Sequence, residues 1–496
     1  MAGFHAELTL PNDPAGVGLA RAFVRELARL AAFAEAEGDA LAGGAEAACA
    51  NLCALAFDPG DAASYTVLGD VTPAGLTLVF REQGIPFDPQ QGPPEQLLPP
   101  DARLRLQGPG MAWYLTHGII DEAHWTNLGR QGMELRVTKA RPQGDVTEHL
   151  PEAALTPFQQ DVPLAPPQEY TIRLLRPAEA VQVSQCIYRA WGYSYPNDDL
   201  YYPDRIAHLN AAGELVSIVA VDAAGEVVGH YALERPDLGP IAGTGQAVVS
   251  PAHRGRKLLE RMRAFAEAEA ARLGLVGFYG QPVTTHTFSQ RGEEDFHAHV
   301  CGVSLGYSPR SVTFKGIASE PLPQRESLLL YFKYLGPPPA AVAHAPPHHR
   351  AMLERLYANL EAPAELGHAA AAHGSGEVQV SLLHGWGAGV IRVRRVGADT
   401  AAEVRRARQD LCDAAAAEVV YLELPLAQPG TPALCAGAEA DGFFFSGLGP
   451  RFAPDGDALR LQYLNCPLDT SRLQVASPFG QGLLAYVAAE RARVGK

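Results

Sequence analysis

The chain has 496 residues, of which 47% are hydrophobic, and its formal net charge is −15. This length predicts about three globular domains, and the composition excludes general disorder. The acidic surplus repels phosphate, so no nucleic acid is expected as a partner.

The first residues and the cysteines indicate the compartment. Residues 1–14 lack a basic region followed by an apolar one, so no secretory signal peptide is expected. No apolar run of about 18 residues occurs, so no membrane span is expected either. The seven cysteines are scattered and form no Cys-x-x-Cys pair, which is typical of reduced thiols. The sequence therefore predicts a cytoplasmic protein with no membrane partner.

Two proline-rich stretches divide the chain, at residues 141–168 and 336–349. Both are interpreted as extended linkers, because proline fixes φ and removes a backbone donor. The expected domains are therefore residues 1–140, 169–320 and 350–496. Helical and strand patterns alternate in all three, which predicts an α+β or α/β multidomain fold.

The first segment mixes helices and strands. Asp13 and Pro14 form a typical helix start, and apolar residues follow at helical spacing. A second helix is predicted over residues 43–57, and a third ends near Ile120. The predicted strands cover residues 63–68, 76–81 and 134–139.

This segment resembles the ATP-binding domain of the GHKL group, and within it the anti-sigma-factor serine kinases of the RsbW type. Glu82-Gln83-Gly84-Ile85-Pro86 stands where that family has its Asp-x-Gly-x-Pro/Ala box. The resemblance implies a GHKL α/β sandwich that binds ATP with Mg²⁺. By position, it implies nucleotide contacts at Asn51, Glu82, Gly84, Pro86, Gly108 and Gly110, with Asn51 also holding Mg²⁺.

Two departures from the family disfavour serine kinase activity. The family's catalytic Glu lies four residues before the helix Asn, where this chain has Ala47, with Glu46 one step earlier. A shift of one residue rotates a side chain by ~100° around a helix, so Glu46 is not expected to replace the missing base. Glu82 also replaces the box Asp with a longer side chain.

The middle segment begins with a strand over residues 170–175 and helices through Arg189 and Leu209. Strands over residues 215–222 and 226–233 are expected to pair through a hairpin turn. The most informative stretch follows: a strand over residues 244–250, a basic turn, and a long amphipathic helix over residues 258–273. A strand over residues 276–283 and a segment ending at Tyr307 complete it.

The basic turn has two interpretations. N–H groups in a first helical turn have no intrahelical partner, and the helix dipole adds partial positive charge. Arg254, Arg256 and Lys257 would add donors for phosphate oxygens. The pattern therefore indicates either a pyrophosphate site or an ordinary solvent-exposed turn.

The turn resembles motif A of the GNAT acyltransferases, Arg/Gln-x-x-Gly-x-Gly/Ala, and the element order from Tyr170 to Lys315 resembles the GNAT fold. Lys257 and Leu259 stand where the family usually has glycine or alanine. The resemblance implies transfer from acetyl-CoA, or another acyl-CoA, to an amine on a small molecule or protein. The implied acyl-CoA contacts are Ala247, Val248, Val249, Arg254, Gly255, Arg256, Lys257, Leu258 and Leu259.

Acyl transfer to an amine needs a polarised carbonyl, a deprotonated amine and a proton for the thiolate. Tyr279, His286 and Tyr307 are the candidate proton-transfer groups, and no general base is assigned among them. His348 and His349 fall in the second predicted linker and are not interpreted as a metal site.

The last segment alternates strands and helices again. Strands are predicted as two pairs, residues 378–383 with 390–394 and residues 441–447 with 459–464. A helix over residues 402–417 leads into a strand over 419–424. This order resembles the second half of a GNAT fold, but no basic turn precedes the helix. We interpret the segment as a degenerate copy without catalytic activity.

Two functional hypotheses result. The first is a bacterial acyl-CoA-dependent N-acyltransferase with a regulatory, anti-sigma-like ATP-binding domain. The alternative is a non-catalytic partner-switching protein that senses ATP and acyl-CoA and docks an anti-anti-sigma-like protein. Ala47, Lys257 and Leu259 favour the alternative. The acyl group, the acceptor, the fate of ATP and the oligomeric state stay open.

Overall fold

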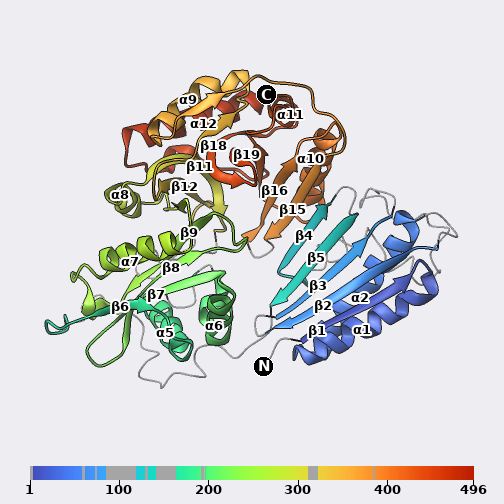
Figure 1. The fold of residues 1–496 in the computed structure, drawn as a ribbon, viewed down its shortest axis with the longest axis horizontal. Helices are drawn as coiled ribbons and strands as arrows, with labels where there is room; N and C mark the ends of the chain where they lie inside the picture. Colours follow the sequence, from blue (N-terminus) through green and yellow to red (C-terminus); the bar gives the residue numbers. More distant parts are fainter. Residues whose placement is uncertain are drawn as a thin grey trace.

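A computed structural model describes residues 4–57, 62–72, 75–84, 119–128, 132–140, 163–191, 195, 197–310, 322–383 and 386–495. It shows a mixed α/β fold of several parts, as predicted (Figure 1). Within the described residues, 17 strands form one continuous sheet, and two short strands form a second. Of the described helices, none is long and apolar enough to span a membrane.

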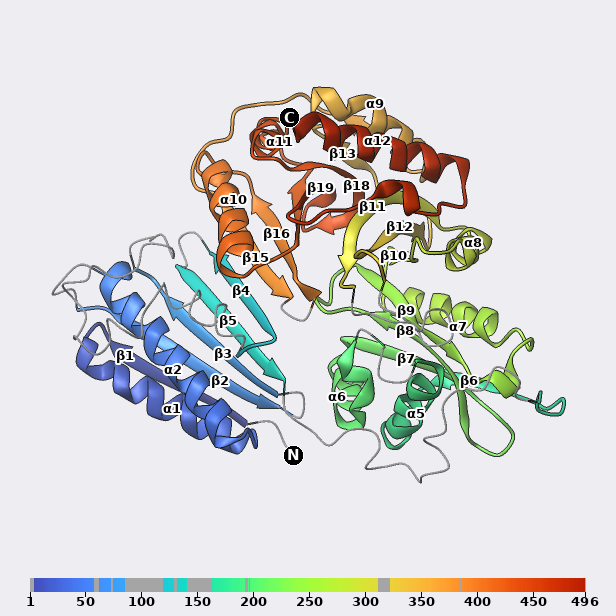
Figure 2. The same cartoon turned by 180° about the vertical axis from the view of Figure 1, so that it is seen from behind.

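Within its described residues, the N-terminal part has five strands in one antiparallel sheet. Its helices α1 and α2 lie on one face of that sheet (Figures 1 and 2). The strands pair in the order β1-β2-β3-β5-β4. A side chain at Gly69 would lie 2.1 Å from Leu27, so this glycine lets α1 approach the sheet. The elements are β1 (Phe4–Pro11), α1 (Val17–Leu30), α2 (Glu35–Asn51), β2 (Ser64–Thr72), β3 (Gly75–Glu82), β4 (Glu122–Asn127) and β5 (Met133–Ala140).

The middle part has helices on both faces of its sheet. Two helices, α5 and α6, cover one face, and α7 covers the other (Figure 2). β9 and β10 run parallel, whereas its other strand pairs are antiparallel. The elements are β6 (Thr171–Leu174), α5 (Ala180–Trp191), α6 (Pro203–Ala212), β7 (Leu215–Val221), β8 (Val227–Glu234), β9 (Ile241–Val249), α7 (Leu258–Arg272), β10 (Gly277–Gly280), α8 (Phe288–Asp295), β11 (His299–Ser308) and β12 (Glu326–Tyr334).

The C-terminal part repeats a parallel pair, β16 with β17, beside antiparallel strands. Both strand pairs predicted here, β15–β16 and β18–β19, are confirmed. Its elements are β13 (Ala341–Ala343), α9 (Arg350–Asn359), β14 (Ala364–Leu366), β15 (Glu377–Leu383), β16 (Ala388–Arg395), α10 (Thr400–Gln409), β17 (Val419–Pro425), α11 (Thr431–Ala440), β18 (Phe444–Ala453), β19 (Gly456–Leu464) and α12 (Pro478–Val494).

The C-terminal part joins the other two by strand pairing at both of its edges. Its β15 pairs antiparallel with β4 of the N-terminal part, and its β18 meets β11 of the middle part at Gly302 and Gly447. A side chain at Gly447 would lie 2.4 Å from a backbone oxygen of Cys301, so only glycine permits this approach. The strands of the middle and C-terminal parts therefore belong to one continuous sheet, joined where β11 meets β18.

The segment predicted as a second linker contains ordered structure. It holds β13, which pairs in parallel with β14, and the 3₁₀ turn η10 (Pro347–His349). Proline fits the first position of such a turn, where its missing N–H costs nothing. The His349 side chain is completely buried, so this end of the segment packs into the C-terminal part.

Candidate functional site

The basic turn between β9 and α7 folds into a compact left-handed bend. After the 3₁₀ turn η9 (Pro251–His253), Gly255 has φ +72° and Lys257 has φ +56°. Lys257 thus adopts the backbone conformation that glycine favours, at a cost of about 1 kcal/mol. The bend forms although this position holds a lysine.

The turn presents cations and N–H groups to solvent. Arg254 is exposed, and the Lys257 side chain is 78% exposed with Glu260 at 4.0 Å. Arg256 Nη2 donates to the Ala165 carbonyl at 2.7 Å, which ties the turn to the preceding segment. In the described part of the chain, no acceptor is found for the N–H groups of residues 255–257. This arrangement suits an anion such as a pyrophosphate.

β9 offers a free backbone edge beside this turn. It pairs with β10 only from Ile241 to Thr244, and its remaining residues pair with β8 on the other side. Ala247 is exposed, whereas Val248 and Leu258 are buried in the core. Val248 and Leu258 would therefore reach a ligand through their backbone, and the free edge could pair with an extended arm.

A bulge in β9 positions a carboxylate that the sequence analysis missed. Gln246 has φ +55° where the pairing with β8 is irregular, and its Nε2 donates to Glu234 Oε1 at 2.9 Å. His230 Nδ1 donates to the Gln246 carbonyl at 3.0 Å. Burial lowers the pKa of His230 to about 4, so the ring is neutral at pH 7. This buried network holds the bulge.

Glu234 lies with two of the three predicted proton-transfer residues. It ends β8 and is half-buried, and burial raises its pKa. Its charge acts on both Tyr279 and Tyr307, and burial raises the pKa of each phenol. His286 lies apart, in the loop before α8, where its Nδ1 accepts the Phe288 N–H at 3.3 Å. Among the described residues its ring has no contact with this group.

The C-terminal part lines the opposite side of this site. The Tyr279 ring lies 5.0 Å from that of Phe452, and the Tyr307 ring lies 5.7 Å from that of Tyr421. Two charged residues of the C-terminal part form an ion pair close to these rings: Glu423 accepts a hydrogen bond from Arg392 Nε at 3.1 Å. This ion pair acts electrostatically on both Tyr279 and Tyr307. The segment interpreted as a degenerate copy therefore contributes side chains to the site.

The N-terminal part has a second candidate site around Asn51. This residue ends α2 and is 2% exposed, and neither polar atom of its amide has a hydrogen-bond partner among the described residues. Buried Glu82 accepts the Gly84 N–H through one oxygen, while its other oxygen has no partner in the part of the chain that the structure describes. Burial raises the Glu82 pKa. Unpaired buried polar groups are costly, and a bound ligand would satisfy them.

Of the other predicted nucleotide contacts, the structure describes Gly84 and leaves three residues undescribed. A side chain at Gly84 would lie 1.9 Å from the Ala56 carbonyl oxygen, so glycine is required there. Pro86, Gly108 and Gly110 lie outside the described residues.

Glu46 does not take the place of the base that the resemblance to serine kinases implies at position 47. Glu46 bonds Arg21 of α1 at 2.6 Å, and Ala47 is buried in the core. The one-residue shift therefore directs the carboxylate toward α1. No carboxylate stands at the family's position.

Replacing Asn51 with alanine should separate ligand binding from stability. The resemblance to GHKL domains implies Mg-ATP binding at Asn51, so we expect Asn51→Ala to abolish such binding. The same change should raise the free energy of unfolding by about 1 kcal/mol, because an unsatisfied buried amide is removed. Asn210→Ala is the matched control: this amide makes bonds to Ile206 and Ser217, so its loss should destabilise. Calorimetry and denaturant unfolding measure both effects. Intact ATP binding in Asn51→Ala would contradict the assignment.

Comparison with known proteins supports the N-terminal prediction. Residues 10–139 match the family model of the histidine kinase-like ATPase domain. The predicted similarity of this part to ATP-binding domains of that type is therefore confirmed. No curated protein matches the chain.

Solved structures similar to this chain include three acetyltransferases. A putative acetyltransferase of the GNAT family from Desulfovibrio desulfuricans is 12% identical, with a TM-score of 0.27; the match covers 34% of this chain and 100% of that protein. An aminoglycoside 6'-N-acetyltransferase complexed with coenzyme A is 19% identical, with a TM-score of 0.25; the match covers 34% of this chain and 99% of that protein. YncA, a putative acetyltransferase from Salmonella typhimurium with acetyl-CoA, is 16% identical (TM-score 0.27; 34% and 95%).

Proposed function

We propose that the protein is an acyl-CoA-dependent N-acyltransferase that also binds ATP through its N-terminal domain. The observation that carries the proposal is the junction of β9 and α7. There a free strand edge over residues 245–249 leads directly into an exposed basic turn at a helix N-terminus. The edge suits the amide-containing arm of an acyl-CoA, and the turn suits its pyrophosphate.

Residues around the β9 bulge supply the acid–base chemistry. Ionised Glu234 accepts the proton of the attacking amine as the new C–N bond forms. The thioester C–S bond then breaks, Tyr279 or Tyr307 protonates the departing thiolate, and the proton taken up by Glu234 returns to the phenolate. Both phenols keep their proton at pH 7 because burial raises their pKa. Gln246, bonded to Glu234, holds the carboxylate in place.

The C-terminal part forms the acceptor side of the site in this proposal. Arg392 and Glu423 lie across from Tyr279 and Tyr307, with Arg460 3.6 Å from Glu423. A paired cation and anion favour an amine that carries a second polar or charged group over a simple alkylamine. The amine acceptor is a small molecule or a protein side chain.

The N-terminal domain is proposed as a regulatory module. The orphaned Asn51 amide supports binding of Mg²⁺ and ATP phosphates, and Ala47 disfavours phosphate transfer to a protein serine. Its strand β4 pairs with β15 of the C-terminal part, so nucleotide binding has a direct structural connection to the acceptor side. A bacterial signalling role in the cytoplasm, with an anti-anti-sigma-like partner, belongs to the same proposal.

Thiol release from acetyl-CoA tests the proposed function. The full-length protein is incubated with acetyl-CoA and a panel of amines: amino acids, polyamines, aminoglycosides and lysine peptides, each with and without Mg-ATP. We expect amine-dependent thiol release, with amines that carry further polar groups preferred over butylamine. Acetyl-CoA binding without release for any amine would contradict catalysis and favour the sensor hypothesis.

A further inference from the structure

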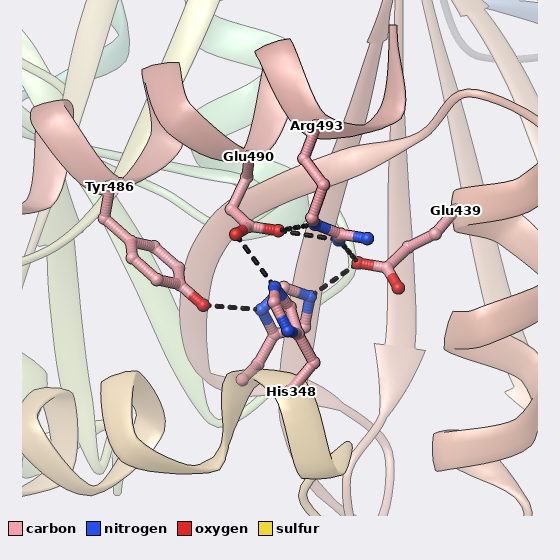
Figure 3. Close-up of polar contacts among 6 residues, drawn as sticks. His348, Glu439, Tyr486, Glu490 and Arg493 are labelled. Atoms are coloured by element: carbon pink, nitrogen blue, oxygen red, sulfur yellow. Dashed lines mark hydrogen bonds and ion pairs between the residues drawn. The ribbon is translucent and has the colours of Figure 1, made fainter. Parts of the chain in front are cut away.

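Five side chains able to bind a metal converge in the C-terminal part. Figure 3 shows His348, Glu439 and Glu490 among them, with their polar contacts. The five side chains come from three separate elements, the turn η10 and the helices α11 and α12. Two overlapping triads share His349, and in each triad one ligand atom per residue lies within 4.8 Å of the others. The five residues, here named the histidine cluster, are His348, His349, Cys435, Glu439 and Glu490.

Hydrogen bonds hold both imidazoles in place. His349 Nε2 donates to Glu439 at 2.8 Å, and its Nδ1 accepts the Tyr486 hydroxyl at 2.8 Å. His348 Nε2 donates to Glu490 at 2.9 Å. Metal-binding histidines are usually oriented in this way, through a bond from the second ring nitrogen. If Nε2 of His349 bound a metal, Nδ1 would carry the proton and the Tyr486 oxygen would accept it.

The charges of the cluster do not balance without a further cation. Glu439 and Glu490 contribute two negative charges, and Arg493, which pairs with both, contributes one positive charge. The Glu490 side chain is 7% exposed and that of Glu439 is 13% exposed, so solvent screens them weakly. A bound divalent ion or a proton on histidine would compensate the one negative charge that is left.

The donor types decide which ion suits the cluster. Two imidazoles, a thiol and carboxylates are the nitrogen, sulfur and oxygen ligands of zinc-like ions, whereas calcium and magnesium prefer oxygen alone. Ligand atoms around tetrahedral zinc lie roughly 3.3–3.8 Å apart, given bond lengths of about 2.0–2.3 Å. The side chains therefore need to close by about 1 Å. Arg493 donates to Glu490 Oε2, the oxygen that His348 does not contact, whereas at Glu439 it shares Oε1 with His349.

We propose that the histidine cluster is a structural site for a zinc-like divalent ion. The ion would bind His349, Cys435 and Glu439, with His348 as the fourth ligand and Glu490 orienting His348. It would link η10, α11 and α12, and so fix the C-terminal helix on its part of the sheet. Binding at histidine nitrogens and a thiolate releases protons, so affinity falls as the pH is lowered.

Zinc binding by the tag-free, full-length protein tests this site. The protein is treated with a chelator, incubated with Zn²⁺, passed over a gel-filtration column and assayed for metal by mass spectrometry. Its melting temperature is recorded with and without Zn²⁺. We expect one zinc ion per chain and a higher melting temperature with zinc, and no such effect with Mg²⁺.

Variants assign the zinc to this cluster. His348→Ala and Cys435→Ser should each lower zinc affinity more than about tenfold. The His348 side chain is 50% exposed, so its loss leaves the fold intact, as circular dichroism would verify. The matched control His373→Ala removes an exposed histidine outside the cluster and should bind zinc normally. Wild-type protein without zinc, or His348→Ala and Cys435→Ser variants that retain wild-type affinity, would overturn the proposal.

Discussion

Replacing Arg254 and Arg256 together with alanine is expected to weaken acetyl-CoA binding by roughly 10- to 100-fold, because charge-assisted hydrogen bonds to phosphate are lost. The expected loss is limited because the turn is exposed and solvent screens its charges. The effect should shrink at high salt. Isothermal titration at low and high salt measures both quantities.

The control variant also loses two positive charges, but at positions away from the turn. Arg272 and Arg291 are both exposed, one at the far end of α7 and one on α8, so their double alanine variant also removes two positive charges. It should bind acetyl-CoA as the wild type does. Equal weakening in both double variants would indicate a general charge effect and contradict a pyrophosphate site in the turn.

Glu234→Gln is expected to lower kcat by about 10²- to 10⁴-fold, the usual contribution of a general base. The change keeps the size of the side chain and its bond to Gln246, so the KM for acetyl-CoA should stay within about twofold of wild type. Initial rates of thiol release at varied acetyl-CoA give both constants. A large rise in KM with unchanged kcat would instead assign Glu234 to binding.

The pH dependence provides a second readout for Glu234. Only the ionised carboxylate accepts a proton, and burial raises its pKa above the ordinary value. The wild-type rate should therefore fall as the pH decreases through this raised pKa. Glu234→Gln should lose that acidic limb, whereas Glu234→Asp should retain it at a lower rate. An acidic limb that persists in Glu234→Gln would exclude Glu234 as the base.

Local patterns predicted the elements that position the site. A predicted hairpin indicated β8, an apolar run indicated β9, and helical spacing indicated α7. Residues Arg254–Lys257 marked the turn between β9 and α7. The helix predicted over residues 43–57 contained Asn51, which the GHKL resemblance singled out; in the structure Asn51 ends α2. These predictions depend on residues that are close in sequence, and no distant contact was needed for them.

The residues that were missed depend on contacts between distant segments. Glu234 has an ordinary carboxylate sequence context and gains its role only from the bulge at Gln246. Arg392 and Glu423 reach the site because β11 and β18 meet at two glycines. His349, expected in a linker, is buried because η10 packs against α11 and α12. The apolar periodicity of a sequence predicts helices and strands, but it does not predict which distant segments pair with one another.

The central claim, that the middle part binds acyl-CoA at the β9–α7 junction, is tested most directly by calorimetric titration of wild-type protein with acetyl-CoA. We expect saturable binding of one molecule per chain, because the C-terminal part lacks a basic turn before α10. Wild-type protein that binds no acetyl-CoA would contradict an acyl-CoA site at this junction.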